Sequence, residues 1–193
     1  NGGIAIMELY GSFTSPFVRH CRIALLETEI PCDFVEVDGA ISAEKSPTKK
    51  VPFLTDGELL LTDSSSIIRY IREQAKQTFL PSCKDLDLYC LINTGMDTEI
   101  NLFLMEKGGV DLNDNPYLQR HKSRVNTTLS ALEEAGIRQL EINNDVHWRL
   151  ACFLDWGLYR NRFSLDAHPK LQAFLNSARK NTIFEQTHPS RTP

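Results

Sequence analysis

The amino-acid sequence predicts a small mixed α+β domain followed by a larger all-helical domain. Short apolar runs separated by turn residues dominate the first third of the 193-residue chain. The remainder instead repeats apolar residues every three or four positions, which is typical of amphipathic helices. A polar stretch that contains Pro81 and Ser82 lies between the two patterns. We therefore predict an N-terminal domain over residues 1–76, a linker over 77–84 and a helical bundle over 85–193.

The first domain is expected to open with a strand, a helix and a second strand. The apolar run Ile6–Tyr10 suits a buried strand, and Ser15-Pro16 has the residues preferred at the start of a helix. This helix should extend to about Glu27, and its buried face should comprise Phe17, Cys21, Ala24, Leu25 and Thr28. The run Asp33–Val37 then forms a second strand, parallel to the first if the helix is a crossover.

A loop, a hairpin and another helix complete this domain. The chain from the second strand to Lys50 is expected to be a loop. Asp56-Gly57 is a strong two-residue turn signal between the runs Val51–Thr55 and Glu58–Thr62. The stretch Asp63–Ser66 should cap a helix. Its expected buried positions are Ile67, Ile68, Ile71 and Ala75.

Helical periodicity covers most of the second domain. Helices are predicted over Lys84–Lys107, Pro116–Ala135, Val146 to about Tyr159, and Pro169–Arg179. Glycines follow the first two of them, as expected at helix ends. Asn144 should cap the third helix, and His147 in its first turn predicts a mild pH dependence of stability.

Composition and charge exclude several classes of function. The 21 Lys and Arg residues against 25 Asp and Glu give a net charge of -4, which lacks the basic excess that nucleic-acid binding demands. No apolar run approaches the roughly 18–20 residues of a membrane span, so we expect no membrane association. The N-terminus shows no features of a secretory signal, and whether residues 1–6 are native is left open. Five widely spaced cysteines predict reduced thiols in the cytoplasm and no metal site.

Ser15 is the first candidate for chemistry. A group bound beside it would face the positive end of a helix and free backbone N–H donors, which stabilise an anion. A hydroxyl at this place can donate a hydrogen bond to a thiolate and so lower the pKa of the thiol. Taken alone, the pattern is explained more simply as a helix cap.

Two further motifs suit a peptide-like ligand. Val51-Pro52 before a strand is compatible with a fixed, sometimes cis, peptide whose backbone pairs with an extended peptide, or with an ordinary proline at a strand start. Asp63-Ser64 at a helix start could hold an amino-acid zwitterion, the carboxylate binding the amine and the hydroxyl and amides binding the carboxylate. Plain capping again explains that pair more simply.

Together, in this order, the three motifs resemble the glutathione S-transferase family. The stretches that carry the resemblance are Met7–Leu25, which contains Ser-Pro-Phe-x-x-Arg, then Lys49–Leu54 and Leu61–Ile71. They are most similar to serine-type and bacterial members, like those of the tau and zeta classes. The resemblance covers residues 7–75 and continues more loosely through the helical half. It implies a thioredoxin-like N-terminal domain, a helical C-terminal domain and a glutathione site on the first.

The resemblance also implies the site residues. Ser15 would hydrogen-bond the glutathione thiolate, although Ser12 and Thr14 are nearby alternatives. Val51, before a cis Pro52, would pair with the tripeptide backbone. The other implied contacts are Asp63 to the γ-glutamyl amine, Ser64 to its carboxylate, and Lys50, with Lys49 a less certain second, to the glycyl carboxylate.

We therefore predict a homodimeric glutathione transferase that uses glutathione as co-substrate against a small hydrophobic electrophile, as in detoxification. Peroxidase or isomerase activity would use the same site. The alternatives are a non-catalytic interaction or stress-regulatory module of the same fold, and a thiol–disulfide oxidoreductase, which requires a cysteine where Ser15 stands. Cys21 is expected to pack in the core.

The resemblance implies an electrophile pocket lined by helices of the second domain. Its candidates are Phe13, Met96, Phe103, Trp156, Tyr159 and Phe163, for which ordinary core packing is the simpler explanation. Arg160 and Arg162 would attract an anionic substrate, or else belong to a solvated helix end.

Overall fold

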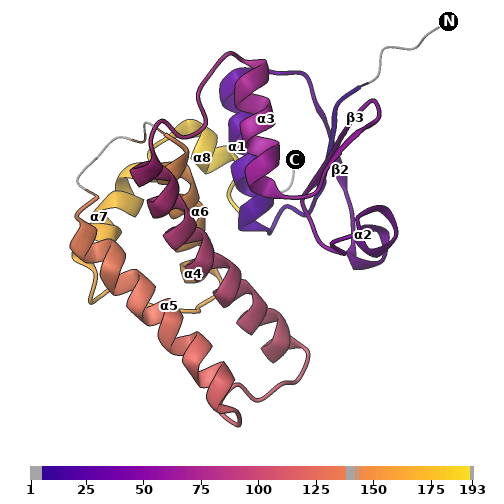
Figure 1. Ribbon diagram of the computed structural model, residues 1–193. Helices are drawn as coiled ribbons and strands as arrows, with labels where there is room; N and C mark the ends of the chain where they lie inside the picture. The colour runs from indigo at the N-terminus through magenta and orange to yellow at the C-terminus, as the bar shows by residue number, and fades with distance from the viewer. Residues whose placement is uncertain (1–5, 138–141, 143, 192–193) are drawn as a thin grey trace, which may run out of the picture. The chain divides into compact units, whose positions relative to one another are not determined.

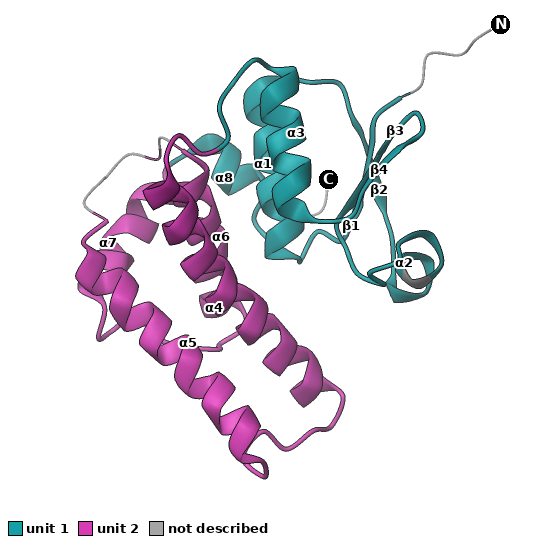
Figure 2. Cartoon of the chain, viewed as in Figure 1, with its two compact units in different colours: residues 1–79, 181–193 teal, residues 80–180 magenta. Residues whose placement is uncertain are grey.

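The computed structural model describes residues 6–137, 142 and 144–191, so the question about the first six residues lies almost wholly outside the described part. The chain divides into two compact units (Figure 2). Residues 1–79 and 181–193 form the first, here the sheet unit, and residues 80–180 form the second, here the helical unit. The C-terminal segment, which the sequence assigned to the helical domain, is therefore part of the sheet unit. The boundaries at residues 76 and 85 stay a prediction.

The sheet has four strands in the order β2-β1-β3-β4. The central strand β1 (Glu8–Gly11) pairs in parallel with β2 (Asp33–Glu36) and antiparallel with β3 (Phe53–Asp56). The last strand, β4 (Leu59–Leu61), is antiparallel to β3. Both the parallel crossover and the hairpin are as predicted. The result is the mixed sheet of a thioredoxin-like domain.

Helices α1 (Pro16–Thr28) and α3 (Ser64–Gln74) are the two that the sequence predicted for this unit (Figure 1). The predicted loop before Lys50 is wrong in part, because α2 (Gly39–Lys45) forms there. The side chain of Asp38 caps this short helix by accepting a hydrogen bond from the Ile41 N–H at 3.0 Å.

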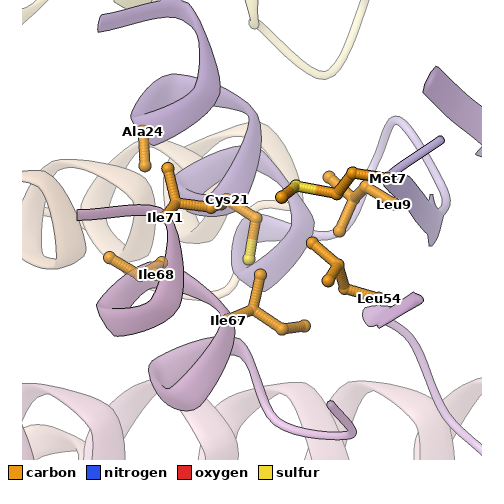
Figure 3. Close-up of a cluster of buried hydrophobic side chains, with 8 residues drawn as sticks. All are labelled: Met7, Leu9, Cys21, Ala24, Leu54, Ile67, Ile68 and Ile71. Carbon is orange, nitrogen blue, oxygen red and sulfur yellow. The ribbon is translucent and has the colours of Figure 1, made fainter. Parts of the chain in front are cut away.

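The main core of the sheet unit lies between one face of the sheet and helices α1 and α3 (Figure 3). Leu9 of β1 and Leu54 of β3 are register partners, and their side chains face Cys21 and Ile67. The buried cluster comprises Met7, Leu9, Cys21, Ala24, Leu54, Ile67, Ile68 and Ile71. At about 1.5–3 kcal/mol for each large apolar side chain, this cluster is a major source of stability for the unit. The expected packing role of Cys21 is confirmed.

Cys21 and Ala24 of α1 are buried as predicted, but burial extends to other sides of the helix. Val18 and Ile23 are fully buried, whereas Phe17, Leu25 and Thr28 are only half-buried. Periodicity alone locates an apolar stripe, but it does not tell on which sides of the helix other elements will pack.

The opposite face of the sheet carries a smaller cluster. Tyr10 and Phe53 are register partners whose rings stack with centroids 4.6 Å apart, and Val37 packs with them. The ammonium group of Lys45 lies 5.0 Å from the Tyr10 ring centroid, which places the end of α2 at this face.

The helical unit contains α4 (Cys83–Lys107), α5 (Pro116–Ala135), α6 (Asp145–Tyr159) and α7 (Pro169–Ala178). All four predicted helices are confirmed to within one residue at each end. α4 packs against α5 and α6, and α7 packs against α5 and α6. α6 is buried along nearly its whole length. The Asn144 side chain accepts a hydrogen bond from the His147 N–H at 3.1 Å, which confirms the predicted cap.

One further helix, α8 (Thr182–Gln186), was not predicted, and it belongs to the sheet unit. With five residues it is too short to show a periodic pattern. Among the described helices, none combines the length and apolar character needed to cross a membrane.

Candidate functional site

The strand pairing brings the three predicted site segments to one edge of the sheet. β1 ends at this edge, and the chain continues from it to Ser15. Because β3 is antiparallel to β1, it starts at the same edge, directly after Pro52. β4 is antiparallel to β3 and therefore ends there, shortly before Asp63. A contact of 3.8 Å from the Cys21 thiol to the Ser64 carbonyl oxygen joins α1 to the first turn of α3.

Ser15 is the N-cap of α1, and its hydroxyl oxygen accepts a hydrogen bond from the Val18 N–H at 3.3 Å. The cap is thus as predicted. This bond uses a lone pair of the oxygen and leaves the hydroxyl proton for another acceptor. The side chain is half-buried, beside the end of the helix where N–H groups carry partial positive charge. The group is therefore suited to donate to an anion.

Ser12 and Thr14 lie in the same short connection between β1 and α1 and are half-buried as well. Ser15 differs from both because it is the cap of the helix. Which of the three hydroxyls would face a bound thiol is a question for substitution.

Asp63 and Ser64 start α3. The Asp63 side chain is exposed, and one carboxylate oxygen accepts a hydrogen bond from the Ser65 N–H at 2.8 Å. Ser64 is the first residue of the helix and is buried. An exposed carboxylate beside a helix N-terminus offers a negative group for an amine next to N–H donors for a carboxylate. This local chemistry is the one that the sequence suggested for a zwitterionic ligand.

The Val51–Pro52 peptide is cis, as the family resemblance implied. Pro52 is buried and Val51 is half-buried, directly before β3. Lys50 precedes them with an exposed side chain, and Lys49 has a left-handed backbone with φ 53°. Two ammonium groups are therefore carried by the segment that enters this edge of the sheet.

Neither Cys21 nor Cys32, the two cysteines of the sheet unit, offers a nucleophile here. Burial raises the pKa of the Cys32 thiol to about 11, which keeps it protonated at neutral pH. Cys21 is fully buried. In the described part of the chain, no three or more His, Cys, Asp or Glu side chains gather so that they could hold a metal ion.

The candidates for an electrophile pocket have different surroundings. Met96 and Trp156 are buried in the helical unit, and Trp156 packs edge-on against Phe103 with ring centroids 5.5 Å apart. Tyr159 is exposed, and Phe13, in the sheet unit, packs against Phe34. For Met96 and Trp156 the simpler explanation, core packing, describes what is seen.

Arg162 is not part of a solvated helix end, as one sequence-based explanation had it. Its Nε donates to a carboxylate oxygen of Glu99 at 2.6 Å, and its Nη2 lies 3.3 Å from Glu106. Burial raises the pKa of the Glu99 carboxyl, and the hydrogen bond from Arg162 opposes this shift. A cavity of about 330 Å³ adjoins the pair within the helical unit. The Arg160 guanidinium instead lies 5.2 Å from the Phe103 and Tyr159 ring centroids.

A mixed four-stranded sheet with two helices on one face and a separate bundle of helices define a two-unit protein with a thioredoxin-like portion. Residues 9–79 match the family model described as the glutathione S-transferase N-terminal domain. The resemblance to the glutathione S-transferase family is thereby confirmed over these residues of the sheet unit.

Curated relatives are similar in sequence to part of the chain. It is 28% identical to glutathione S-transferase 1 of Zea mays over 107 residues, which are 52% of this chain and 50% of that protein. The chain thus spans about half the length of the curated relatives it matches.

Solved structures agree over nearly the whole chain. A glutathione transferase family member from Pseudomonas fluorescens Pf-5, crystallised with bound glutathione, has a TM-score of 0.84 at 21% identity, covering 96% of this chain and 100% of that one. Maleylacetoacetate isomerase from Anaeromyxobacter dehalogenans 2CP-1, with glutathione in its active site, has a TM-score of 0.76 at 20% identity, covering 97% of each chain. The chain therefore has the glutathione S-transferase fold.

Proposed function

We propose that this protein binds glutathione at the described edge of its sheet unit and activates the thiol for attack on a small hydrophobic electrophile. The observation that carries the proposal is the meeting of the α1 and α3 N-termini at one sheet edge, with a free hydroxyl proton on Ser15 and an exposed carboxylate on Asp63. Similar folds crystallised with glutathione support this choice of ligand.

Each end of glutathione has a receptor of opposite charge in this arrangement. Asp63 binds the γ-glutamyl amine, while Ser64 and the first N–H groups of α3 bind the adjacent carboxylate. Val51, before Pro52, pairs with the peptide backbone of the ligand. The ammonium of Lys50 faces the glycyl carboxylate. The thiol then lies beside Ser15.

The hydroxyl of Ser15 contributes more to thiol activation than the helix does. A helix N-terminus stabilises an anion by about 0.3–1 kcal/mol, which is less than one pKa unit. A hydrogen bond to a charged group contributes about 1.5–3 kcal/mol, or roughly one to two pKa units. The thiol proton leaves to solvent, and the thiolate sulfur forms a bond to the electrophilic carbon of the second substrate. In a substitution the leaving group departs with the electron pair of its broken bond, and in an addition the electron pair of the opened multiple bond takes up a proton from solvent.

Titration calorimetry with reduced glutathione tests the binding site. We expect binding by the wild type and a loss of about tenfold or more in affinity in both Asp63→Ala and Asp63→Asn, because each removes a charge-assisted bond. Asp63→Asn keeps an oxygen that can cap α3, so it separates the charge from the cap. Asp111→Ala is the matched control, since Asp111 is exposed and accepts a similar bond from the Asn113 N–H at 2.9 Å. An absence of heat with millimolar glutathione would overturn the proposal.

The thiolate absorbance of the glutathione complex, followed against pH, tests activation. Ser15→Ala should raise the apparent thiol pKa by about one to two units, while Ser12→Ala and Thr14→Val leave it in place. A shift in one of the latter variants instead would move the role to that hydroxyl. Binding with an unshifted thiol pKa in the wild type would favour the second candidate function, a non-catalytic interaction or stress-regulatory module.

We further propose a cytoplasmic homodimer. Light scattering of a species with the mass of one chain, 21.9 kDa, at micromolar concentration would contradict the dimer.

A further inference from the structure

Arg19 is a charged residue inside the sheet unit, and nothing in the proposed chemistry uses it. Only 2% of the residue is exposed. It lies one helical turn after Ser15 on α1, where its backbone N–H donates to the Ser15 carbonyl oxygen at 2.9 Å. A guanidinium is costly to bury unless its N–H groups are hydrogen-bonded, so its partners are informative.

Those partners come from the C-terminal segment. Arg19 Nε donates to the Thr187 hydroxyl at 3.1 Å, and Nη2 donates to the Phe184 carbonyl oxygen. The guanidinium carbon lies 3.6 Å from the Phe184 ring centroid, a close cation–π contact. Residues more than 160 positions apart in sequence are thus joined inside one unit.

Arg19 and helix α8 stabilise each other. A helix of five residues such as α8 is not stable alone. The carbonyl groups at its C-terminal end carry partial negative charge, which the Arg19 guanidinium complements. Thr187, which is fully buried, donates its hydroxyl to a carbonyl of α8 and accepts from Arg19 with the same oxygen. α8 in turn packs against α1 (Figure 1).

The first turn of α1 is held on its other side by β1. A Cβ atom added at Gly11 would lie 2.6 Å and 2.7 Å from the two methyl carbons of Val18, so no side chain fits between them. Val18 is fully buried, and its N–H is the donor to the Ser15 hydroxyl. Contacts on Val18 and on Arg19 therefore hold the turn that carries Ser15.

We propose that the C-terminal segment 181–191 is a working part of the glutathione site: through Arg19, a positioning residue, it sets where the Ser15 hydroxyl lies. This inference rests on the proposed function for its catalytic consequence. The positioning itself concerns only the folded chain.

Thr187→Val tests the proposal, because valine has nearly the shape of threonine and removes only the hydroxyl. Thr182→Val is the matched control, since Thr182 is exposed on the same short helix. Hydrogen exchange of the Val18 amide, measured by NMR without ligand, reports directly on the Ser15 cap. We expect it to rise about tenfold in Thr187→Val, the effect of losing one hydrogen bond to a charged group, and to stay at the wild-type rate in Thr182→Val.

The catalytic consequence should appear in the pH profile of kcat/KM and hardly at all in KM for glutathione. In Thr187→Val and Arg19→Met, the pH profile of kcat/KM should move to higher pH, while KM for glutathione changes less than about twofold. Arg19→Lys should lie between them and the wild type, because it keeps the charge without the planar fork.

The outcomes separate the two proposals. Unchanged Val18 exchange, or faster exchange with an unchanged pH profile, would overturn the positioning role. A wild type that binds no glutathione would overturn the proposed function, and the exchange result would still decide whether the C-terminal segment holds the α1 turn.

Discussion

The polar side chains at the sheet edge and those that join packed helices in the helical unit find their partners over different distances along the chain. At the sheet edge, the Ser15 and Asp63 side chains accept hydrogen bonds from N–H groups three and two residues further on. In the helical unit, Arg162 pairs with Glu99, which lies 63 positions earlier in the sequence, and Glu99 is buried. The local bonds leave a proton or a carboxylate oxygen available for a ligand. The distant pairs connect packed helices.

The starts of α1, α3 and α7 are also capped over different distances. α1 and α3 are capped by their own N-cap side chains. The His168 side chain makes no capping bond for α7, and the Glu133 carboxylate of α5 accepts from the Lys170 and Leu171 N–H groups, at 2.9 Å each. We infer that substitutions at the sheet edge change ligand binding more than stability, and that those at the distant pairs do the reverse.

The largest effect is expected from Arg162→Met, which leaves the Glu99 carboxylate buried without its cation. Breaking a buried pair in this way costs about 3–5 kcal/mol, measured as the free energy of unfolding in urea. The double variant Glu99→Leu with Arg162→Met should recover most of that loss, because neither charge is then left buried. Glutathione affinity should stay unchanged in both. A loss of glutathione affinity without a loss of stability would contradict the difference inferred between the sheet edge and the distant pairs.

A smaller effect is expected from Glu133→Ala, which removes both acceptors at the start of α7. The loss of a cap and its hydrogen bonds should lower the free energy of unfolding by about 1–2 kcal/mol. Glu134→Ala is the control, because Glu134 is its exposed neighbour on α5. Equal effects of the two substitutions in urea denaturation would show that the distant cap does not contribute.

Substitutions of Ser15 separate stability from chemistry at the sheet edge. Ser15→Ala should cost about 1 kcal/mol through the lost cap, whereas Ser15→Asp should keep the stability, since aspartate is a good N-cap. Both should lose thiol activation, because neither side chain donates a hydrogen bond at neutral pH. Thermal melts measure the change in stability, and the thiolate absorbance measures the change in thiol activation. Activation retained in Ser15→Asp would contradict the role of the hydroxyl.

The smallest effect is the pH dependence that His147 confers. Burial lowers the pKa of this imidazole, and the Asp85 carboxylate opposes the shift. The unfolded chain therefore binds a proton more readily, so stability is lost as pH falls through the ordinary histidine pKa of about 6.5. Glu99, whose pKa is raised, acts in the opposite sense on acidification. Between pH 7.5 and pH 5, the melting temperature should therefore fall less in His147→Gln than in the wild type. An equal fall in both proteins would contradict the role of His147.

Elements that depend on near neighbours were predictable from the sequence. The caps at Ser15, Asp63 and Asn144, the turn at Asp56-Gly57 and the four long helices all appear as expected. Each depends on residues within about four positions, which is the range of a helical turn or a hairpin loop. The short helices α2 and α8 escaped prediction, since five to seven residues give too little periodicity.

Burial and partner choice were not predictable in this way. Nothing local distinguishes the buried guanidinium of Arg19 from an exposed one, and the solvated alternative for Arg162 was wrong for the same reason. Their partners lie 165 and 63 positions away. The resemblance to the family, in contrast, could be seen from the order of three short motifs, because it does not depend on contacts between distant residues.

By itself, therefore, the sequence determined where most elements start and end, the pairing of the hairpin and the residues offered at the sheet edge, because these follow from local backbone bonding and periodicity. Only the tertiary structure decided that the C-terminal segment returns to α1, how far burial extends around α1 and which charges are paired. Those outcomes depend on which surfaces meet once the chain is packed, because a buried charge is stable only where a partner from elsewhere in the chain reaches it.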